Sequence, residues 1–287
     1  MATLADFNSP LLPTWCPGCG NFAIWTCLKQ ALVEKGLSPM DVNLCFDIGC
    51  NGNGADKINA YAFKGLHGRT IPLASGISLG NHKLPVIGIG GDGGTFDEGM
   101  AHLIHAIRSN YKFLFILHNN CDFGLTTGQA TPTTPQGQKM NSSPYGVVES
   151  RLNPGQLVLA SGASFYARGF TGNIPQLKEL IVKGLEHEGF AFLEVLQHCP
   201  TYNKFQDHLY LNSRVYDVKT DENHKNDRRY VYDLVDYSNE KIATGLLYQD
   251  PESTSYYSRL EKRKGMETTL KDEVKVYDIA EQVKEFI

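Results

Sequence analysis

The sequence has no excess of basic residues and no long apolar run. Its 27 lysines and arginines are outnumbered by 31 aspartates and glutamates, so the formal net charge is −4. A surface that binds nucleic acid or anionic lipid needs a basic excess, and we expect neither partner. No segment approaches the roughly 18 apolar residues of a membrane span. Residues 1–13 contain no basic residue and no apolar core, so we expect no signal peptide and a cytoplasmic protein.

The common nucleotide-binding signatures are also missing. No Gly-x-Gly-x-x-Gly opens the first strand–helix unit, and no glycine-rich loop ends in Gly-Lys-Ser/Thr. The seven cysteines are an odd number in a long chain, which argues against a disulfide framework. We therefore interpret the cysteines as thiols of a reducing compartment, where clustered cysteines more often bind metal or carry out redox chemistry.

Apolar residues recur at helical or strand spacing along most of the chain. Residues 21–35 show helical spacing, and Gly36 stands where a helix C-cap is expected. Another helix is expected at 96–109, with Thr95 and Glu98 as a capping box at its start. Further elements are a helix at 177–188 and buried strands at 42–48, 85–90, 113–118 and 190–197. This order predicts an α/β fold with a mainly parallel sheet and helices on both faces.

The character of the sequence changes beyond about residue 205. The segment 217–241 is dense in charged residues. We therefore expect a binding domain at 1–205 and a C-terminal extension at 206–287 that contacts a partner subunit. A final helix is expected at 272–286.

Four residues with metal-binding side chains each follow the end of a predicted strand. Cys50 and Asp92 follow the first two strands, and Asn120 and Cys199 follow the next two. Open α/β sheets bind their ligands outside the carboxyl ends of the strands. We therefore expect these four side chains at one rim of the sheet.

Residues 91–94, Gly-Asp-Gly-Gly, lie between a predicted strand and a predicted helix. Glycines let the backbone approach a phosphate closely, and the helix N-terminus offers unpaired N–H groups. The Asp92 carboxylate suits a hard cation such as Mg²⁺, to which the Asn120 amide oxygen and the Asp122 carbonyl can add. Taken alone, such a motif is more often a glycine-rich turn with an N-capping aspartate. The Asn-Asn pair that ends the next strand favours a phosphate and magnesium site instead.

The cysteines suggest a second site. Cys16 and Cys19 form a C-x-x-C, while Cys50 and Cys199 stand singly at strand ends. The second local C-x-x-C of a zinc ribbon is absent. Four thiolates from three loops suit either a [4Fe–4S] cluster or zinc, and the spacing leaves both open. The remaining cysteines are two expected core residues, Cys27 and Cys45, and one without an assigned role, Cys121.

Seven short motifs occur together in this chain. They lie at 15–20 (WCPGCG), 47–50 (DIGC), 67–69 (HGR), 91–94 (GDGG), 120–126 (NCDFGLT), 129–133 (QATPT) and 199–201 (CPT). Together they resemble the β subunit of 2-oxoacid:ferredoxin oxidoreductases over about residues 10–205. The pairing of Gly-Asp-Gly with Asn-Asn is similar to the thiamine-diphosphate motif. The resemblance therefore implies a thiamine-diphosphate-binding fold, of which this chain supplies the diphosphate-binding domain.

The resemblance also implies roles for the matched residues. The [4Fe–4S] ligands would be Cys16, Cys19, Cys50 and Cys199. The Mg²⁺ ligands would be Asp92, Asn120 and the backbone of Asp122. The diphosphate loop would be Gly91, Gly93 and Gly94, and further cofactor contacts would be Ile48, Gly49, Gly124 and Thr126. Two residues would face the cofactor as catalytic candidates, Leu125 near the thiazolium and substrate, and His67. Without the resemblance, His67 is a histidine of a surface loop.

The implied reaction is the oxidative decarboxylation of a 2-oxoacid to acyl-CoA and CO₂, with reduction of ferredoxin. The substrate class, 2-oxoglutarate or pyruvate, stays open, because Asn53 and Thr127 depart from residues found in many relatives. No motif supplies the glutamate that activates the aminopyrimidine, and the resemblance implies that a separate α subunit provides it, so we expect no activity of this chain alone. The dense C-x₂-C-x₂-C-x₃-C run of ferredoxins is absent, so electrons must leave to another carrier.

Two other interpretations compete with this one. A non-redox thiamine-diphosphate carboligase or decarboxylase subunit would keep Asp92 and Asn120 but would have no use for four spaced cysteines. A zinc-stapled binding protein without catalysis would use the cysteines but would leave the Gly-Asp-Gly and Asn-Asn motifs unexplained.

Overall fold

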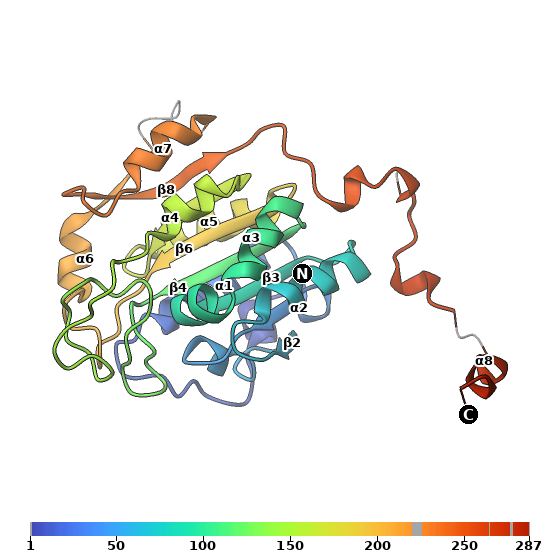
Figure 1. Cartoon of the computed structure of the whole chain (residues 1–287), viewed down its shortest axis with the longest axis horizontal. Coiled ribbons are helices and arrows are strands. Elements are labelled where there is room, and N and C mark those ends of the chain that lie inside the picture. The colour runs from blue at the N-terminus through green and yellow to red at the C-terminus, as the bar shows by residue number, and fades with distance from the viewer. Residues whose placement is uncertain (1, 220–225, 264, 276–277, 287) are drawn as a thin grey trace.

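One mainly parallel sheet forms the centre of the molecule (Figure 1). The computed structural model describes residues 2–219, 226–263, 265–275 and 278–286, and within these ranges the sheet has eight strands in the order β2-β1-β3-β4-β6-β5-β8-β7. The strands are β1 (Asn43–Phe46), β2 (Tyr61–Lys64), β3 (Val86–Gly91), β4 (Phe113–Asn119), β5 (Phe165–Phe170), β6 (Phe190–Leu196), β7 (Val215–Asp217) and β8 (Ile242–Gln249). Neighbouring strands of this sheet are parallel except β5 and β8, which are antiparallel.

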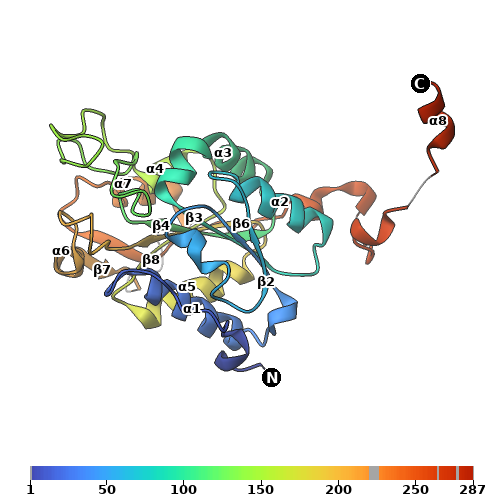
Figure 2. The same ribbon diagram turned by 90° about the horizontal axis from the view of Figure 1, so that it is seen from below.

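Helices cover both faces of the sheet, which confirms the predicted α/β fold (Figure 2). One face carries α1 (Asn21–Glu34) and α5 (Ile174–Glu186). The other carries α2 (Thr70–Gly80), α3 (Met100–Ser109), α4 (Pro154–Ala160) and α7 (Arg228–Leu234). Two further short helices are α6 (His208–Arg214), which precedes α7, and α8 (Ala280–Lys284). The described residues also form 3₁₀ turns at Leu4–Phe7, Pro39–Asp41, Asn51–Gly54, Tyr257–Arg259, Glu261–Arg263 and Lys271–Glu273.

Each face of the sheet buries its own apolar cluster. The central strands β4 and β6 are buried along their whole length. Their continuous apolar sequence is typical of parallel strands that are covered on both faces. Cys27 belongs to one cluster and Cys45 to the other, both without exposed surface, so the prediction that they are core residues is confirmed.

The helix predicted at 96–109 begins differently from the expectation. Helical backbone already starts at Asp92, runs through a π-helical turn at Gly94–Glu98, and resumes as α3 after Gly99. The predicted capping box is wrong, because Thr95 lies inside this earlier turn. Its hydroxyl finds no partner among the described residues, and the Glu98 side chain bonds to His67 instead.

The chain beyond residue 205 first joins the sheet and then leaves the body. β7 and β8 extend the sheet beyond β5, and the chain after residue 250 runs outward to α8 (Figure 1). The helix predicted at 272–286 is largely wrong, since its described part is helical only at Lys271–Glu273 and Ala280–Lys284; residues 276, 277 and 287 lie outside the described ranges. The division of the chain at residue 205 stays a prediction.

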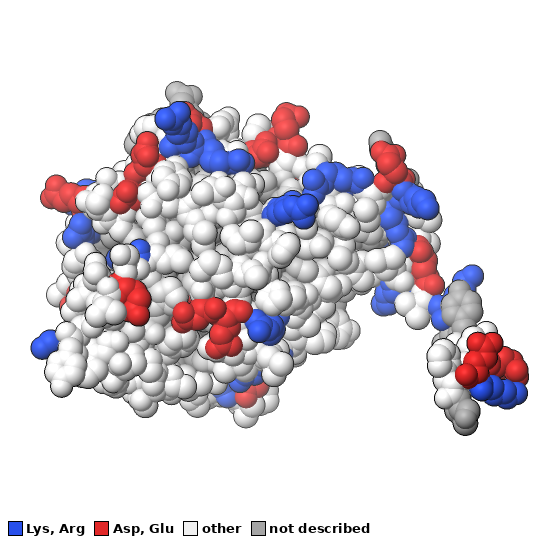
Figure 3. All heavy atoms as spheres, in the orientation of Figure 1, with Lys and Arg blue, Asp and Glu red and all other residues white. Residues whose placement is uncertain are grey.

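The surface seen in Figure 3 carries lysines and arginines interspersed with acidic residues. Across the described parts of the chain, none of the helices has the length and apolar character needed to cross a membrane.

Candidate functional site

The carboxyl ends of β1, β3, β4 and β6 lie next to one another in the sheet. Because these strands are parallel, the loops that follow them meet at a single rim. Two adjoining cavities open there, of about 180 and 210 Å³. Their common wall consists of Cys50, Asn120, Gly124, Leu125 and Gln197.

The first cavity collects the residues that the sequence predicted for the cofactor. They are Ile48, Gly49, His67, Gly91, Asp92, Gly93, Gly94, Asn120, Asp122, Gly124, Leu125 and Thr126, and all twelve line this cavity. The remaining wall includes three buried polar residues that sequence reasoning missed, Asn21, Asn51 and His118. Asn21 and Asn51 directly follow the motifs at 15–20 and 47–50, whereas His118 lies inside a predicted strand and offered no signal.

Three oxygen atoms converge at the base of this cavity. One polar atom of the Asn120 amide lies 2.8 Å from Oδ1 of Asp92 and 2.9 Å from the main-chain oxygen of Asp122. With the amide oxygen in this place, as in the structure, three oxygens face one another; a half-turn of the amide would let its nitrogen donate to both neighbours. Octahedral Mg²⁺ holds oxygens at about 2.0–2.1 Å, which separates adjacent ligands by about 2.9 Å. The oxygen orientation therefore suits a bound cation, and the nitrogen orientation suits its absence.

Two threonines hold the other oxygen of Asp92. The hydroxyls of Thr131 and Thr133 donate to Oδ2 at 2.5 and 2.6 Å, so Oδ1 is the oxygen that faces Asn120. Burial raises the pKa of Asp92 to about 6, although both threonine hydrogen bonds lower it. The motif at 129–133 thus supplies the hydrogen bonds that hold Asp92, a role that the sequence analysis did not predict.

Asp122 has a buried side chain beside these ligands. Neither carboxylate oxygen has a hydrogen-bond partner of ordinary geometry among the described residues. Burial and the charge of Asp92 raise the pKa of this carboxyl to about 7. Asp92 and Asp122 thus place two buried carboxyl groups in one wall, and a bound cation would offset the cost of ionising both.

The glycine at position 93 permits close packing in the same loop. A Cβ at Gly93 would lie 2.1 Å from the ring of Phe123. Only glycine lets this ring lie against the loop, and the ring in turn stands 5.7 Å from the His67 ring. Nδ1 of His67 lies 2.6 Å from Oε1 of Glu98, so Nε2 is the ring nitrogen that remains available.

The second cavity collects the predicted cysteines, Cys16, Cys19, Cys50 and Cys199. A Cβ at Gly124 would lie 2.9 Å from Oδ1 of Asp122 and 3.3 Å from Sγ of Cys50, so a larger residue there would crowd the Asp122 carboxylate beside these sulfurs. In the ranges that the structure covers, no three His, Cys, Asp or Glu side chains are arranged to hold a metal ion. The four cysteines surround a space rather than converging on one point.

Burial and N–H donors act on these thiols in opposite directions. Burial raises the pKa of Cys19 to about 11 and that of Cys50 to about 12. The backbone N–H of Asn21 opposes this shift at Cys19, and those of Tyr202 and Asn203 oppose it at Cys199. Donors that point at sulfur favour the thiolate form, which is the form that binds metal.

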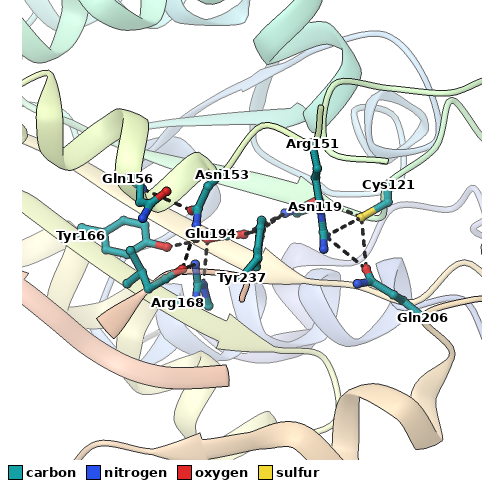
Figure 4. A network of polar contacts seen from close by, with 11 residues as sticks. Asn119, Cys121, Arg151, Asn153, Gln156, Tyr166, Arg168, Glu194, Gln206 and Tyr237 are labelled. Carbon is teal, nitrogen blue, oxygen red and sulfur yellow. Dashed lines mark hydrogen bonds and ion pairs between the residues drawn. The ribbon is translucent and has the colours of Figure 1, made fainter. Parts of the chain in front are cut away.

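A buried polar network includes Asn119 and Cys121, the residues on either side of Asn120 (Figure 4). Glu194 of β6 forms an ion pair with Arg168 at 2.9 Å, and both side chains are almost fully buried. Glu194 also accepts from Tyr237 at 2.8 Å and from Nδ2 of Asn119 at 2.7 Å. Burial would raise the pKa of Glu194, but Arg168 and the hydrogen bonds from Tyr166 and Asn119 outweigh it and hold the pKa below its usual value. The network fixes Asn119, the residue directly before Asn120.

Arg151 forms the second part of this network (Figure 4). Its guanidinium donates to the main-chain oxygen of Thr133 at 2.7 Å and to Oε1 of Gln206 at 3.3 Å. It also donates to Sγ of Cys121 at 3.4 Å. Cys121 is therefore a buried structural residue, with left-handed backbone (φ 57°) in the turn between the two proposed Mg²⁺-ligand residues.

Comparisons with known proteins agree with this geometry. Residues 47–195 match the family described as thiamine pyrophosphate enzyme, C-terminal TPP binding domain, and residues 199–265 match the family described as the C-terminal part of the pyruvate ferredoxin oxidoreductase beta subunit. The chain is 43% identical over 209 residues to the 2-oxoacid:ferredoxin oxidoreductase subunit beta of Saccharolobus solfataricus, covering 72% of this chain and 68% of that protein. It is 36% identical over 269 residues to the corresponding subunit of a Sulfolobus species, covering 88% and 87%.

A solved structure is similar over nearly the whole chain. It is 2-oxoglutarate:ferredoxin oxidoreductase from Magnetococcus marinus with 2-oxoglutarate, coenzyme A and succinyl-CoA bound. The TM-score is 0.87 at 30% identity, with 99% of this chain and 96% of that chain covered. These relatives give no support to a non-redox carboligase or a zinc-stapled binding protein. The chain therefore belongs to the 2-oxoacid:ferredoxin oxidoreductase family, as a β subunit with a thiamine-diphosphate-binding domain.

Proposed function

We propose that the first cavity binds thiamine diphosphate through Mg²⁺, with Asp92, Asn120 and the main-chain oxygen of Asp122 as protein ligands. The observation that carries this proposal is the separation of the Asn120 amide atom from the other two oxygens, 2.8 and 2.9 Å. With the amide oxygen facing the other two, these values match adjacent corners of a magnesium octahedron; with the amide turned over they match N–H···O hydrogen bonds. The diphosphate would supply further oxygens, as Mg²⁺ sites on phosphates usually require.

The glycine loop would receive the diphosphate itself. Gly91, Gly93 and Gly94 line the cavity where helical backbone begins, so N–H groups without helical partners would be available to a phosphate bound there. Ile48, Gly49, Gly124 and Thr126 would make further contacts with the cofactor. Leu125, which is half exposed on the common wall, and His67 would face the substrate.

The second cavity would hold a [4Fe–4S] cluster on Cys16, Cys19, Cys50 and Cys199. Four thiols around one space and N–H donors to Cys19 and Cys199 suit a metal site of either kind, and the family's dependence on ferredoxin supports the cluster over zinc. Because the two cavities share a wall, the cluster would lie next to the cofactor and could take electrons from it.

Thiamine diphosphate supplies the electron sink for decarboxylation of a 2-oxoacid. The residues of this chain hold its diphosphate and orient it against the cluster. A separate α subunit would complete the active site, and ferredoxin and coenzyme A would receive the electrons and the acyl group. We propose a cytoplasmic enzyme for substrates of the 2-oxoglutarate or pyruvate class; the Magnetococcus marinus enzyme, solved with 2-oxoglutarate, supports the former.

Binding of thiamine diphosphate to the complex with the α subunit tests this proposal. Titration calorimetry with and without Mg²⁺ should show metal-dependent binding, which the substitution Asp92→Ala should abolish. Asp97→Ala removes an exposed carboxylate outside the ligand set and should leave binding intact. Unchanged, metal-dependent binding by the Asp92→Ala complex would contradict the proposed ligand set.

A further inference from the structure

Gln197 has its side chain between the two cavities. It follows β6, is only 2% exposed, and lines both the cofactor cavity and the cysteine cavity. Its backbone N–H donates to the main-chain oxygen of Asn119 at 3.0 Å, which fixes it to the end of β4. A buried amide in this position faces any charge that moves between the cavities.

The amide of Gln197 makes one directed contact with the cysteines. Nε2 donates to Sγ of Cys19 at 3.7 Å, within the range of hydrogen bonds to sulfur. Oε1 has no partner of ordinary hydrogen-bond geometry among the described residues, although the Gln197 side chain lies close enough to His118 to oppose the lowering of that histidine's pKa by burial. Turning the amide over would bring that oxygen against the sulfur, where a thiolate would repel it. The observed orientation is therefore the one that a cluster-bound Cys19 favours.

The neighbouring loop leaves room for this side chain. A Cβ at Gly20 would lie 2.5 Å from Cγ of Gln197 and 3.0 Å from Cγ2 of Thr171. Gly20 has ordinary helical backbone, with φ −61°, so its conformation does not require glycine. The need is steric, because any larger residue would displace Gln197 from Cys19.

The other N–H donors to these sulfurs come from the backbone. Asn21 provides one for Cys19, and residues 201–203 provide those for Cys199. Within the described chain, Gln197 is the amide side chain that donates to one of the four sulfurs, while the Asp122 carboxyl contacts Cys199. It is therefore the donor that a substitution can remove without altering the loops.

We propose that Gln197 raises the reduction potential of the cluster through its hydrogen bond to Cys19. This inference rests on the proposed function, since it requires a [4Fe–4S] cluster on these cysteines. Addition of one electron makes the cluster more negative, and a donor to a ligand sulfur stabilises the reduced form more than the oxidised form. Gln197 thereby sets the driving force for the electron that enters from the cofactor cavity.

An anaerobic redox titration of the αβ complex tests the proposal, with dithionite as the reductant and the reduced cluster followed by electron paramagnetic resonance. Gln197→Leu removes the donor at nearly the same volume, and Gly20→Ala displaces it while keeping the amide. Gln176→Leu is the matched control, because the side chain of Gln176 is also buried but donates to nothing in the described chain and lies on α5.

Both Gln197→Leu and Gly20→Ala should lower the potential. We expect the equilibrium constant for reduction to fall about three- to tenfold, the worth of one hydrogen bond, and a tenfold change is about 59 mV for one electron. The control should keep the wild-type value. If Gln197→Leu fails to assemble, Gly20→Ala alone decides the question.

The two ways of failing are distinguishable. A wild-type complex without iron would overturn the proposed function itself. A wild-type complex with an intact cluster, and variants whose iron content and potential equal those of the control, would overturn the role of Gln197 and leave the proposed function standing.

Discussion

Binding of Mg²⁺ and thiamine diphosphate should weaken in acid because of one proton on Asp92. Without a cation, burial holds the pKa of this carboxyl at about 6, above its ordinary 3.8. Mg²⁺ binds the ionised carboxylate. Below that pKa, binding must therefore displace the proton from Asp92, which weakens it. At pH 5 about one Asp92 in eleven is ionised, which makes metal-dependent binding about tenfold weaker than at pH 8.

The substitution Thr133→Val isolates this effect. The Thr133 hydroxyl donates to Oδ2 of Asp92 at 2.6 Å and lowers the pKa of the carboxyl. Its loss should raise that pKa and move the acid limb of the binding profile to higher pH. Thr70→Val is the control, because the buried Thr70 hydroxyl has no partner in the described chain.

Titration calorimetry between pH 5 and 8, with Mg²⁺ in excess, measures the profile. Protonation of the cofactor's own phosphate is common to all three proteins, so the shift between them reports the protein carboxyl. Superimposable profiles for wild type and Thr133→Val, or affinity that stays flat from pH 8 to 5, would refute the reasoning.

Three further outcomes follow from the packing and the sites. Glu194→Gln leaves the buried Arg168 charge without its counter-ion and should lower the free energy of unfolding by about 3–5 kcal/mol in denaturant titrations; a loss below 1 kcal/mol would mean that the pair is not buried. Gly93→Ala places a methyl group 2.1 Å from an aromatic ring and should abolish cofactor binding in calorimetry, whereas normal affinity would argue against a closely packed loop. Cys199→Ser should lose iron on elemental analysis while Cys27→Ser, in the apolar core, should keep it; equal iron in both would remove Cys199 from the ligand set.

The sequence predicts four of the eight described strands, β1, β3, β4 and β6, because these are short, continuous apolar runs; it does not predict β5, in which Arg168 interrupts the apolar run. The same runs predicted the rim, since the chemically distinctive residues follow them directly. The edge strand β2 is not predicted, because its side chains are largely exposed and its sequence therefore lacks the apolar run of a buried strand. The strands β7 and β8 are not predicted, because the charged segment 217–241 beside them does not show the apolar pattern of a buried strand.

The candidate site was predictable as a set of residues but not as a set of contacts. Motif spacing brought Asp92, Asn120 and the cysteines to one rim. It gave no sign that Thr131 would hold Asp92, or that Gln197 would reach Cys19 across 178 positions of sequence. Such contacts depend on side-chain packing between loops, which local patterns do not encode. The false capping box at Thr95 has the same origin, because the packed glycine loop starts the helix earlier.

The most direct test of the account is the iron, sulfide and zinc content of the anaerobically purified αβ complex, measured together with its visible spectrum. The account predicts about four iron and four sulfide for the cysteines of each copy of this chain, beyond those of any other cluster-bearing subunit, with broad visible absorbance that bleaches on reduction. Zinc in place of iron, persisting after anaerobic reconstitution, would remove the electron path between the two cavities and contradict the account.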